Sequence, residues 1–184
     1  MDRIRMTGPE SPYYRQAMEL YAAGFSLHEQ RRTEEQIQAM RDPAFHCDAL
    51  VESGTFIGLL FYWEAVGVTY VEHFAVVEAL RSSGAGSRAL AAFCPAHAPV
   101  VLEIDPPVDA VSPRRKGFYQ RLGFAENSYA HRHPPYRTGF APHPLVVMSW
   151  PEALSPEAYS TFSRMLSHRV MRYAQVGISQ LAAT

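Results

Sequence analysis

The stretch "LRSSGAGSRAL", residues 80–90, joins an apolar run to a helical run in this 184-residue chain. It contains Gly84 and Gly86, with Arg81 and Arg88 toward its two ends. We expect a helix to begin within it, and the first turn of a helix presents N–H groups that have no internal partner. Those groups attract anions, and glycine lets a ligand approach the backbone closely. Taken alone, the stretch fits either a glycine-softened helix start or an anion-binding turn.

Two common phosphate-binding motifs do not describe this stretch. A P-loop requires a lysine followed by Ser or Thr after its last glycine, whereas Ser87 and Arg88 follow Gly86 here. A dinucleotide fingerprint requires a third glycine and an acidic residue about 20 residues further on, and the third glycine is missing. Any phosphate bound here is therefore held in another way.

The composition predicts one globular domain with a substantial core. Hydrophobic residues make up 47% of the chain, charged residues 19%, and the formal net charge is −1. This balance gives no reason to expect nucleic acid or an anionic membrane as a partner. The N-terminus lacks the apolar run of a signal peptide, and the longest apolar run, "FIGLLFYW", is too short to span a bilayer. We therefore expect a cytoplasmic protein, with Cys47 and Cys94 as reduced core thiols.

Apolar, β-branched and aromatic runs predict the strands. Three such runs at residues 45–53, 55–66 and 69–77 are separated by "SG" and "G" turns and read as antiparallel strands. Further strands are expected at residues 3–6, 99–105 and 143–150. Helices are expected at residues 11–26, 32–42, 88–94 and 114–123, the third of them stopped by Pro95. This order predicts an α/β fold with one mixed sheet and helices on both faces.

The end of the chain predicts a further helix. It begins at Ser155 and carries a stripe of apolar residues at helical spacing, typical of a packing face. We expect a core domain over residues 1–150 and a C-terminal helical extension, residues 151–184, packed on it. This helix and exposed strand edges also allow a homodimer.

Two motifs in order carry a resemblance to a known family. Arg81-x-x-Gly84-x-Gly86 directly follows the strand "EHFAV", and "GFYQRLGF" at residues 117–124 follows the next strand. The chain thereby resembles the GNAT acyltransferase superfamily, which has a Gln/Arg-x-x-Gly-x-Gly/Ala motif after its fourth strand and a Phe-Tyr-x-x-x-Gly-Phe helix after its fifth. The resemblance covers about residues 1–150. It implies a mixed, mostly antiparallel sheet splayed between strands 4 and 5.

The resemblance also implies acetyl-CoA as the acyl donor. Its pyrophosphate is expected on the glycine stretch, at Arg81, Ser82, Ser83, Gly84, Ala85, Gly86 and Ser87. The pantetheine arm is expected along the end of the fourth strand, at Phe74, Ala75 and Val76. Many relatives have an asparagine before the second motif, where this chain reads "DAVSPRRKG". That departure leaves the corresponding CoA contact to Ser112 or Arg115.

Transfer to an amine requires a proton donor for the departing thiolate and a base for the amine. Tyr119 matches the tyrosine of the family that protonates the thiolate, and a phenol with a pKa of about 10 is protonated at neutral pH. Glu72 and Glu103 are the candidates for the base, because burial raises the pKa of a carboxyl group. Strand alternation predicts that Glu72 shares a face with Phe74 and that His73 faces the other way. A water-mediated base is the alternative.

The acceptor pocket is expected to involve the loop "NSYAHRHPPYRTGFAPH", residues 127–143. Its Tyr129, Tyr136 and Arg137 are the candidate substrate contacts, and an arginine there is suited to a carboxylate-bearing acceptor. The pair His131-x-His133 has no third ligand nearby in sequence, so we expect no metal.

The sequence therefore predicts an N-acetyltransferase that moves an acetyl group to the amine of a small molecule or peptide. The reaction is expected to proceed by direct attack when both substrates are bound, with acetyl-CoA as cosubstrate. A non-catalytic acyl-CoA-binding regulatory or sensor module is the alternative. A plain nucleotide-binding protein is disfavoured by the missing P-loop lysine.

Overall fold

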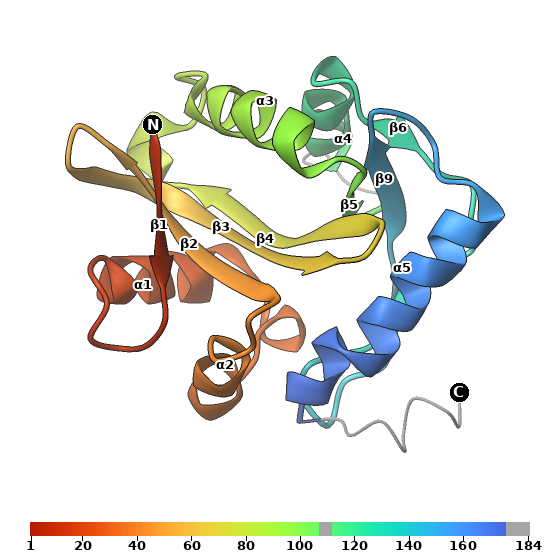
Figure 1. The fold of residues 1–184 in the computed structure, drawn as a ribbon, viewed down its shortest axis with the longest axis horizontal. Helices are drawn as coiled ribbons and strands as arrows, with labels where there is room; N and C mark the ends of the chain where they lie inside the picture. The colour runs from red at the N-terminus through yellow and green to blue at the C-terminus, as the bar shows by residue number, and fades with distance from the viewer. Residues whose placement is uncertain (107–111, 176–184) are drawn as a thin grey trace.

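A seven-stranded mixed sheet forms the centre of the computed structural model, which describes residues 1–106 and 112–175 (Figure 1). The strand order is β1-β2-β3-β4-β5-β9-β6. All neighbours are antiparallel except β4 and β5, which are parallel. The strands are β1 (Asp2–Met6), β2 (Phe45–Glu52), β3 (Thr55–Ala65), β4 (Val68–Val76), β5 (Val100–Ile104), β6 (Ala125–Glu126) and β9 (Val146–Trp150). The predicted mixed, mostly antiparallel sheet is confirmed.

Helices cover both faces of this sheet, as predicted. Figure 1 shows α3 and α4 on one side of the sheet and α1 and α2 on the other, with α5 beside β9. A short hairpin of β7 and β8 lies outside the main sheet. These elements are α1 (Tyr14–Gly24), α2 (Thr33–Ala39), α3 (Ala85–His97), α4 (Ser112–Arg121), α5 (Pro156–His168), β7 (Arg132–His133), β8 (His143–Pro144) and the 3₁₀ turns η1 (Leu27–Glu29), η2 (Glu78–Leu80) and η3 (Val170–Tyr173).

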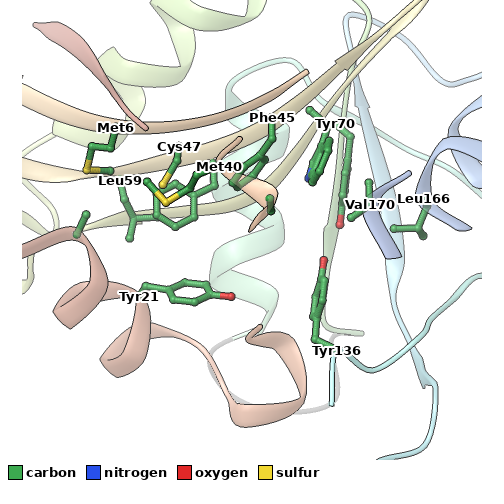
Figure 2. Packing of buried hydrophobic residues seen from close by; sticks show 14 of the residues in the cluster. Met6, Tyr21, Met40, Phe45, Cys47, Leu59, Tyr70, Tyr136, Leu166 and Val170 are labelled. Atoms are coloured by element: carbon green, nitrogen blue, oxygen red, sulfur yellow. The ribbon is translucent and has the colours of Figure 1, made fainter. Parts of the chain in front are cut away.

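Two hydrophobic clusters, one on each face, hold the layers together. Under α1, α2 and α5 the cluster includes Tyr21, Phe45 and Trp63, and part of it is drawn in Figure 2. Under α3 and α4 it includes Phe93 and Leu90. Complete burial of one such side chain contributes about 1.5–3 kcal/mol relative to leaving it exposed. The site described below lies where the two clusters meet, between β4 and β5.

The helix α3 extends further than its sequence suggests. The prediction that Pro95 ends it is wrong, because α3 continues through Pro95 to His97. A proline inside a helix removes one backbone hydrogen bond. The last turn is held instead by side chains: the His97 ring stacks on Phe93 at 4.1 Å between centroids, and its Nδ1 lies 2.9 Å from Glu64 Oε1.

A β-bulge interrupts the alternation of β4. The register with β3 shifts so that Glu72 has no paired residue, which leaves two consecutive side chains on one face. Glu72 contacts Arg31, and His73 packs its ring edge-on against Tyr21 at 4.8 Å, both on the side of α1. Phe74 packs in the opposite cluster. The predicted faces are therefore wrong: Glu72 lies with His73 and not with Phe74.

The parallel strands β4 and β5 separate after three residue pairs. Pairing ends at Val71 and Leu102. Glu72 and Glu103 are the next residues on the two strands. The predicted splay is thus present. We call the point where β4 and β5 separate the fork, and one carboxylate lies on each side of it.

The C-terminal elements α5 and η3 pack into the first cluster. Phe162 and Val170 are fully buried there, and Ser155 caps α5 by accepting a hydrogen bond from the Ala158 N–H. The division of the chain at residue 150 stays a prediction. Within residues 1–106 and 112–175, no helix is both long and apolar enough to cross a membrane.

Candidate active site

A cleft of about 840 Å³ opens where β4 and β5 separate. It is lined from both faces of the sheet. On one face its walls come from the start of α3 and from α4, and on the other from the end of α1, η1 and residues 133–145. Such a channel through a sheet gives two ligands access to one another from opposite sides.

The glycine stretch forms the cleft wall at the N-terminus of α3. Gly84 is the N-cap residue with φ = 80°, a left-handed conformation that glycine adopts without steric cost, and Ser82 has φ = 70°. Ser83 and Ala85 do not line the cleft: the Ser83 hydroxyl donates to the Leu80 carbonyl at 2.8 Å, and Ala85 is buried. The predicted residues of the stretch that do line it are Arg81, Ser82, Gly84, Gly86 and Ser87.

Arginines surround this end of the cleft. Arg81 comes from the glycine stretch, and Arg114, Arg115 and Arg121 come from α4. Arg115 is half-exposed and pairs with Asp105 at 2.9 Å. Together with the N–H groups in the first turn of α3, these guanidinium groups fit a ligand that carries several phosphate charges.

The predicted strand segment forms the wall between the two ends. Phe74, Ala75 and Val76 line the cleft, and among the described residues β4 has no β5 partner beyond Val71. A Cβ placed on Gly86 would lie 3.5 Å from the side chains of Phe74 and Val76, in ordinary van der Waals contact, so the start of α3 packs directly on this strand segment. A free strand edge of this kind can pair with an extended ligand.

Tyr119 projects from α4 into the cleft wall and is only 8% exposed. Burial raises the pKa of its hydroxyl to about 12. The phenol is therefore protonated at neutral pH and available as a proton donor.

Glu72 is held in a buried ion pair with Arg31. Two guanidinium nitrogens donate to its two oxygens at 2.8 and 2.6 Å, and the Tyr136 hydroxyl donates to Oε1 at 2.5 Å. Burial alone would raise the pKa of Glu72, but the charge and hydrogen bonds of Arg31 outweigh it and the pKa is lowered. The direction is opposite to the one expected from the sequence.

Arg31 is a residue of this site that the sequence does not predict. It lies in the connection from η1 to α2, where its neighbours in "EQRRTEEQ" suggest a solvated segment. In the fold it is fully buried: its guanidinium lies 4.7 Å from the Tyr136 ring centroid, and Nη2 donates to the Val170 carbonyl at 3.3 Å. No local signal distinguishes it from Arg32, which is exposed.

Glu103 is held by histidines and a tyrosine. Its Oε1 bonds to His131 Nε2, its Oε2 accepts from the Tyr70 hydroxyl at 2.5 Å, and His133 Nε2 lies 3.7 Å from Oε2. Burial would raise the pKa of Glu103, but the two histidines and Tyr70 outweigh it and the pKa is lowered. His131 Nδ1 lies 3.0 Å from the Tyr159 hydroxyl of α5, which extends the chain of contacts to the C-terminal helix.

His133 lines the cleft, and its Nδ1 is a hydrogen-bond donor. Its Nδ1 lies 2.5 Å from the Pro134 carbonyl oxygen, which only accepts hydrogen bonds, so Nδ1 carries the proton. Nε2 lies 3.7 Å from Glu103 Oε2 and 3.5 Å from the Tyr136 hydroxyl. The Tyr70 hydroxyl donates to Glu103 and the Tyr136 hydroxyl donates to Glu72. Figure 2 shows these two hydroxyl groups pointing toward one another.

The three predicted acceptor contacts lie in different places. Tyr136 is buried and lines the cleft. Tyr129 does not line it: its ring stacks on Tyr159 at 3.9 Å, and its hydroxyl donates to a backbone carbonyl. Arg137 lies outside the lining as well, with Nε donating to the Gln30 carbonyl at 3.0 Å. The acceptor role of Tyr129 and Arg137 stays a prediction.

No group of three or more His, Cys, Asp and Glu side chains among the described residues is placed to hold a metal ion. His131 and His133 both lie against Glu103. Their place in the site is explained by that carboxylate.

The mixed sheet splayed at a cleft, with a glycine turn and a buried tyrosine on its walls, defines an acetyltransferase fold. Residues 14–124 match the model of the acetyltransferase (GNAT) family. The chain belongs to this family.

Solved structures give the same result. A GNAT-family protein from Bacteroides thetaiotaomicron is 31% identical, with a TM-score of 0.86 over 93% of this chain and 98% of that chain. A GNAT acetyltransferase from Elizabethkingia anophelis with acetyl-CoA bound has a TM-score of 0.54 at 14% identity, over 80% and 95%. An IAA acetyltransferase from Bacillus cereus has a TM-score of 0.51 at 15% identity, over 80% and 97%. These last two show the fold alone. No curated protein sequence matches significantly.

Proposed function

We propose that the protein is an acetyl-CoA-dependent N-acetyltransferase that acetylates the amine of a small molecule or peptide by direct attack within a ternary complex. The observation that carries the proposal is a single cleft. It joins an arginine-rich helix N-terminus to a buried tyrosine and two carboxylates at the fork of the sheet. The acetyl-CoA held by the Elizabethkingia anophelis protein of the same fold supports this donor.

The arginine-rich end suits the donor. The backbone N–H groups at the start of α3, with Arg81, Arg114 and Arg115, would hold its phosphates, and the free edge of β4 would pair with its pantetheine arm. When bound, acetyl-CoA supplies an acetyl thioester that an amine can attack. Tyr119 then gives its hydroxyl proton to the departing sulfur, because burial keeps that proton on the oxygen at neutral pH.

The base is best assigned to the pair of His133 and Glu103. An amine attacks only when neutral, so one proton must leave the ammonium group. A neutral His133 ring can accept this proton at Nε2, and Glu103, whose pKa is lowered, stays ionised 3.7 Å away and would stabilise the imidazolium that forms. Glu72 is a weaker candidate, because Arg31 and Tyr136 occupy its oxygens.

Release of free CoA thiol from acetyl-CoA across a panel of amines tests the proposal. Tyr119→Phe removes only the hydroxyl and should lower kcat by about ten-fold or more, with the Kd for acetyl-CoA unchanged. Tyr13→Phe is the matched control, since Tyr13 lies outside the cleft lining and its hydroxyl donates to the Gly54 carbonyl. Equal turnover in the two variants would remove Tyr119 from the mechanism. Tight acetyl-CoA binding by calorimetry without thiol release from any amine would favour the sensor module instead.

A further inference from the structure

The charges of the cleft are segregated between the two faces of the sheet. Its lining arginines come from the glycine stretch and α4, on the face of α3. Its lining carboxylates are Glu29, Glu72 and Glu103, which stand at the fork or beyond it on the face of α1. Among the lining residues that the structure describes, no arginine or lysine lies on that second face. Arg31 compensates the charge of Glu72 from behind the lining, and two histidines lie against Glu103. Glu29 is therefore the lining carboxylate that has no ion pair among the described residues, and it gives the acceptor end its negative charge.

Glu29 is the carboxylate with a free oxygen. Its Oε2 accepts a hydrogen bond from the Ser26 N–H at 2.8 Å and another from the Ser26 hydroxyl, while Oε1 accepts none from the described residues. Burial would raise the pKa of Glu29, but the hydrogen bonds from Ser26 outweigh it, so the pKa is lowered and the group is ionised at neutral pH. The other two carboxylates have partners on both oxygens.

The main chain of Glu29 is fixed to β4 beside the fork. His73, which the bulge of β4 turns toward α1, bonds through Nε2 to the Glu29 carbonyl at 2.9 Å. Its ring packs between Tyr21 and Phe25, at 4.8 and 4.6 Å between centroids. A charge on η1 is therefore held at a set position relative to the fork, as a specificity contact requires.

Aromatic rings complete the acceptor end. Phe25, Tyr70 and Tyr136 line the cleft beside these carboxylates. Aromatic faces attract cations, and they do so most strongly where water is excluded. Arg137, the residue that suggested an acceptor with a carboxylate, donates to backbone carbonyls outside the lining.

We infer that the acceptor is a diamine or polyamine: one amine reacts at the fork, and a second ammonium group binds to Glu29. An acceptor with a carboxylate in that place meets a fixed negative charge and is rejected. This inference rests on the proposed function, because it names the amine that the same cleft acetylates.

The experiment compares three series of primary amines matched in chain length. The far end of each molecule carries an ammonium group (alkyl diamines of increasing length, extended to spermidine), a methyl group (monoamines) or a carboxylate (amino acids). Thiol release gives kcat/KM for each. We expect the best diamine to exceed its monoamine by about ten-fold or more, and the amino acid to be poorest.

The variant Glu29→Gln keeps an oxygen that can accept from Ser26 and removes the charge. It should reduce the ratio of diamine to monoamine kcat/KM to near one, with the loss appearing in KM. Glu35→Gln is the matched control: Glu35 caps α2 through Arg32 as Glu29 caps η1, lies outside the cleft lining, and should leave the ratio unchanged.

Each outcome has a distinct meaning. Preference for amino acids, or a ratio that Glu29→Gln does not alter, overturns the inference and leaves the proposed function standing. If no amine releases thiol, the proposed function fails. Calorimetry with the best-binding diamine then decides the inference: binding that Glu29→Gln abolishes supports it, and absence of diamine binding to the wild-type chain overturns it.

Discussion

The ion pair of Arg31 and Glu72 gives the sharpest test of how the site is held together. Both side chains are at most 1% exposed, and two hydrogen bonds of 2.8 and 2.6 Å join them. Arg31→Met replaces the guanidinium with an apolar group and leaves the Glu72 charge buried without its arginine partner, with the Tyr136 hydrogen bond still in place. Breaking such a pair from one side costs about 3–5 kcal/mol. For a domain of this size we expect Tm to fall by about 6–20 °C at neutral pH.

The loss should depend on pH with a definite sign. In the wild-type chain Arg31 lowers the pKa of Glu72 below its ordinary 4.5, so the pair stabilises the fold above that pH and the contribution is lost as pH falls through the lower, folded value. In the variant, burial without Arg31 raises the pKa of Glu72. Its carboxyl group then takes up a proton on mild acidification, which relieves the penalty. The difference between the two proteins is therefore largest near pH 8 and shrinks toward about pH 4.

Urea unfolding of both proteins at pH 8 and pH 5 measures this difference. The double variant Arg31→Met, Glu72→Gln, which removes the stranded charge, should recover much of the loss at pH 8. A loss below about 1 kcal/mol at pH 8, or an equal loss at both pH values, would refute the reasoning, because a desolvated unpaired carboxylate predicts neither result.

Two further predictions concern the donor turn and the C-terminal helix. Gly84→Ala places a Cβ on a residue with φ = 80°, which should lower the free energy of unfolding by about 1–2 kcal/mol and raise the Kd for acetyl-CoA. Thermal denaturation measures the first effect and calorimetry the second. An unchanged Tm would contradict the predicted backbone strain. Tyr159→Phe removes the hydroxyl that contacts His131 Nδ1, so the His131 ring that bonds to Glu103 is less firmly oriented. We expect kcat to fall several-fold and its pH profile to shift, while the KM for acetyl-CoA stays constant. Tyr13→Phe, which keeps the ring stacked on Phe56 and lies outside the cleft lining, should have neither effect.

The features that could be predicted from the sequence are those with a local cause. The strands follow from β-branched and aromatic runs, and the glycine turn follows from the need for a positive φ at Gly84. The motif around Tyr119 placed that residue on a helix, and the structure brings it to the same cleft as the glycine turn.

The features that escaped prediction depend on partners far away in the chain. The bulge at Glu72 is a property of the register with β3, so alternation along β4 alone gives the wrong face for His73. Arg31 is 41 residues from Glu72 in sequence, and nothing around it indicates burial. The role of His133 beside Glu103 likewise exists only after the loop folds back on β5.

The contact of Arg31 with Val170 has a consequence for the synthesis of the protein. Val170 lies 139 residues after Arg31, which a ribosome covers in about 7–28 s. Once Glu72 has been made, 41 residues after Arg31, the nascent chain contains both members of the ion pair but lacks the last carbonyl that Arg31 binds until Val170 is added. His131 likewise lacks its Tyr159 partner until α5 is made. We expect chains truncated before η3 to expose the acceptor side of the fork to proteases and chaperones. Such chains should be inactive.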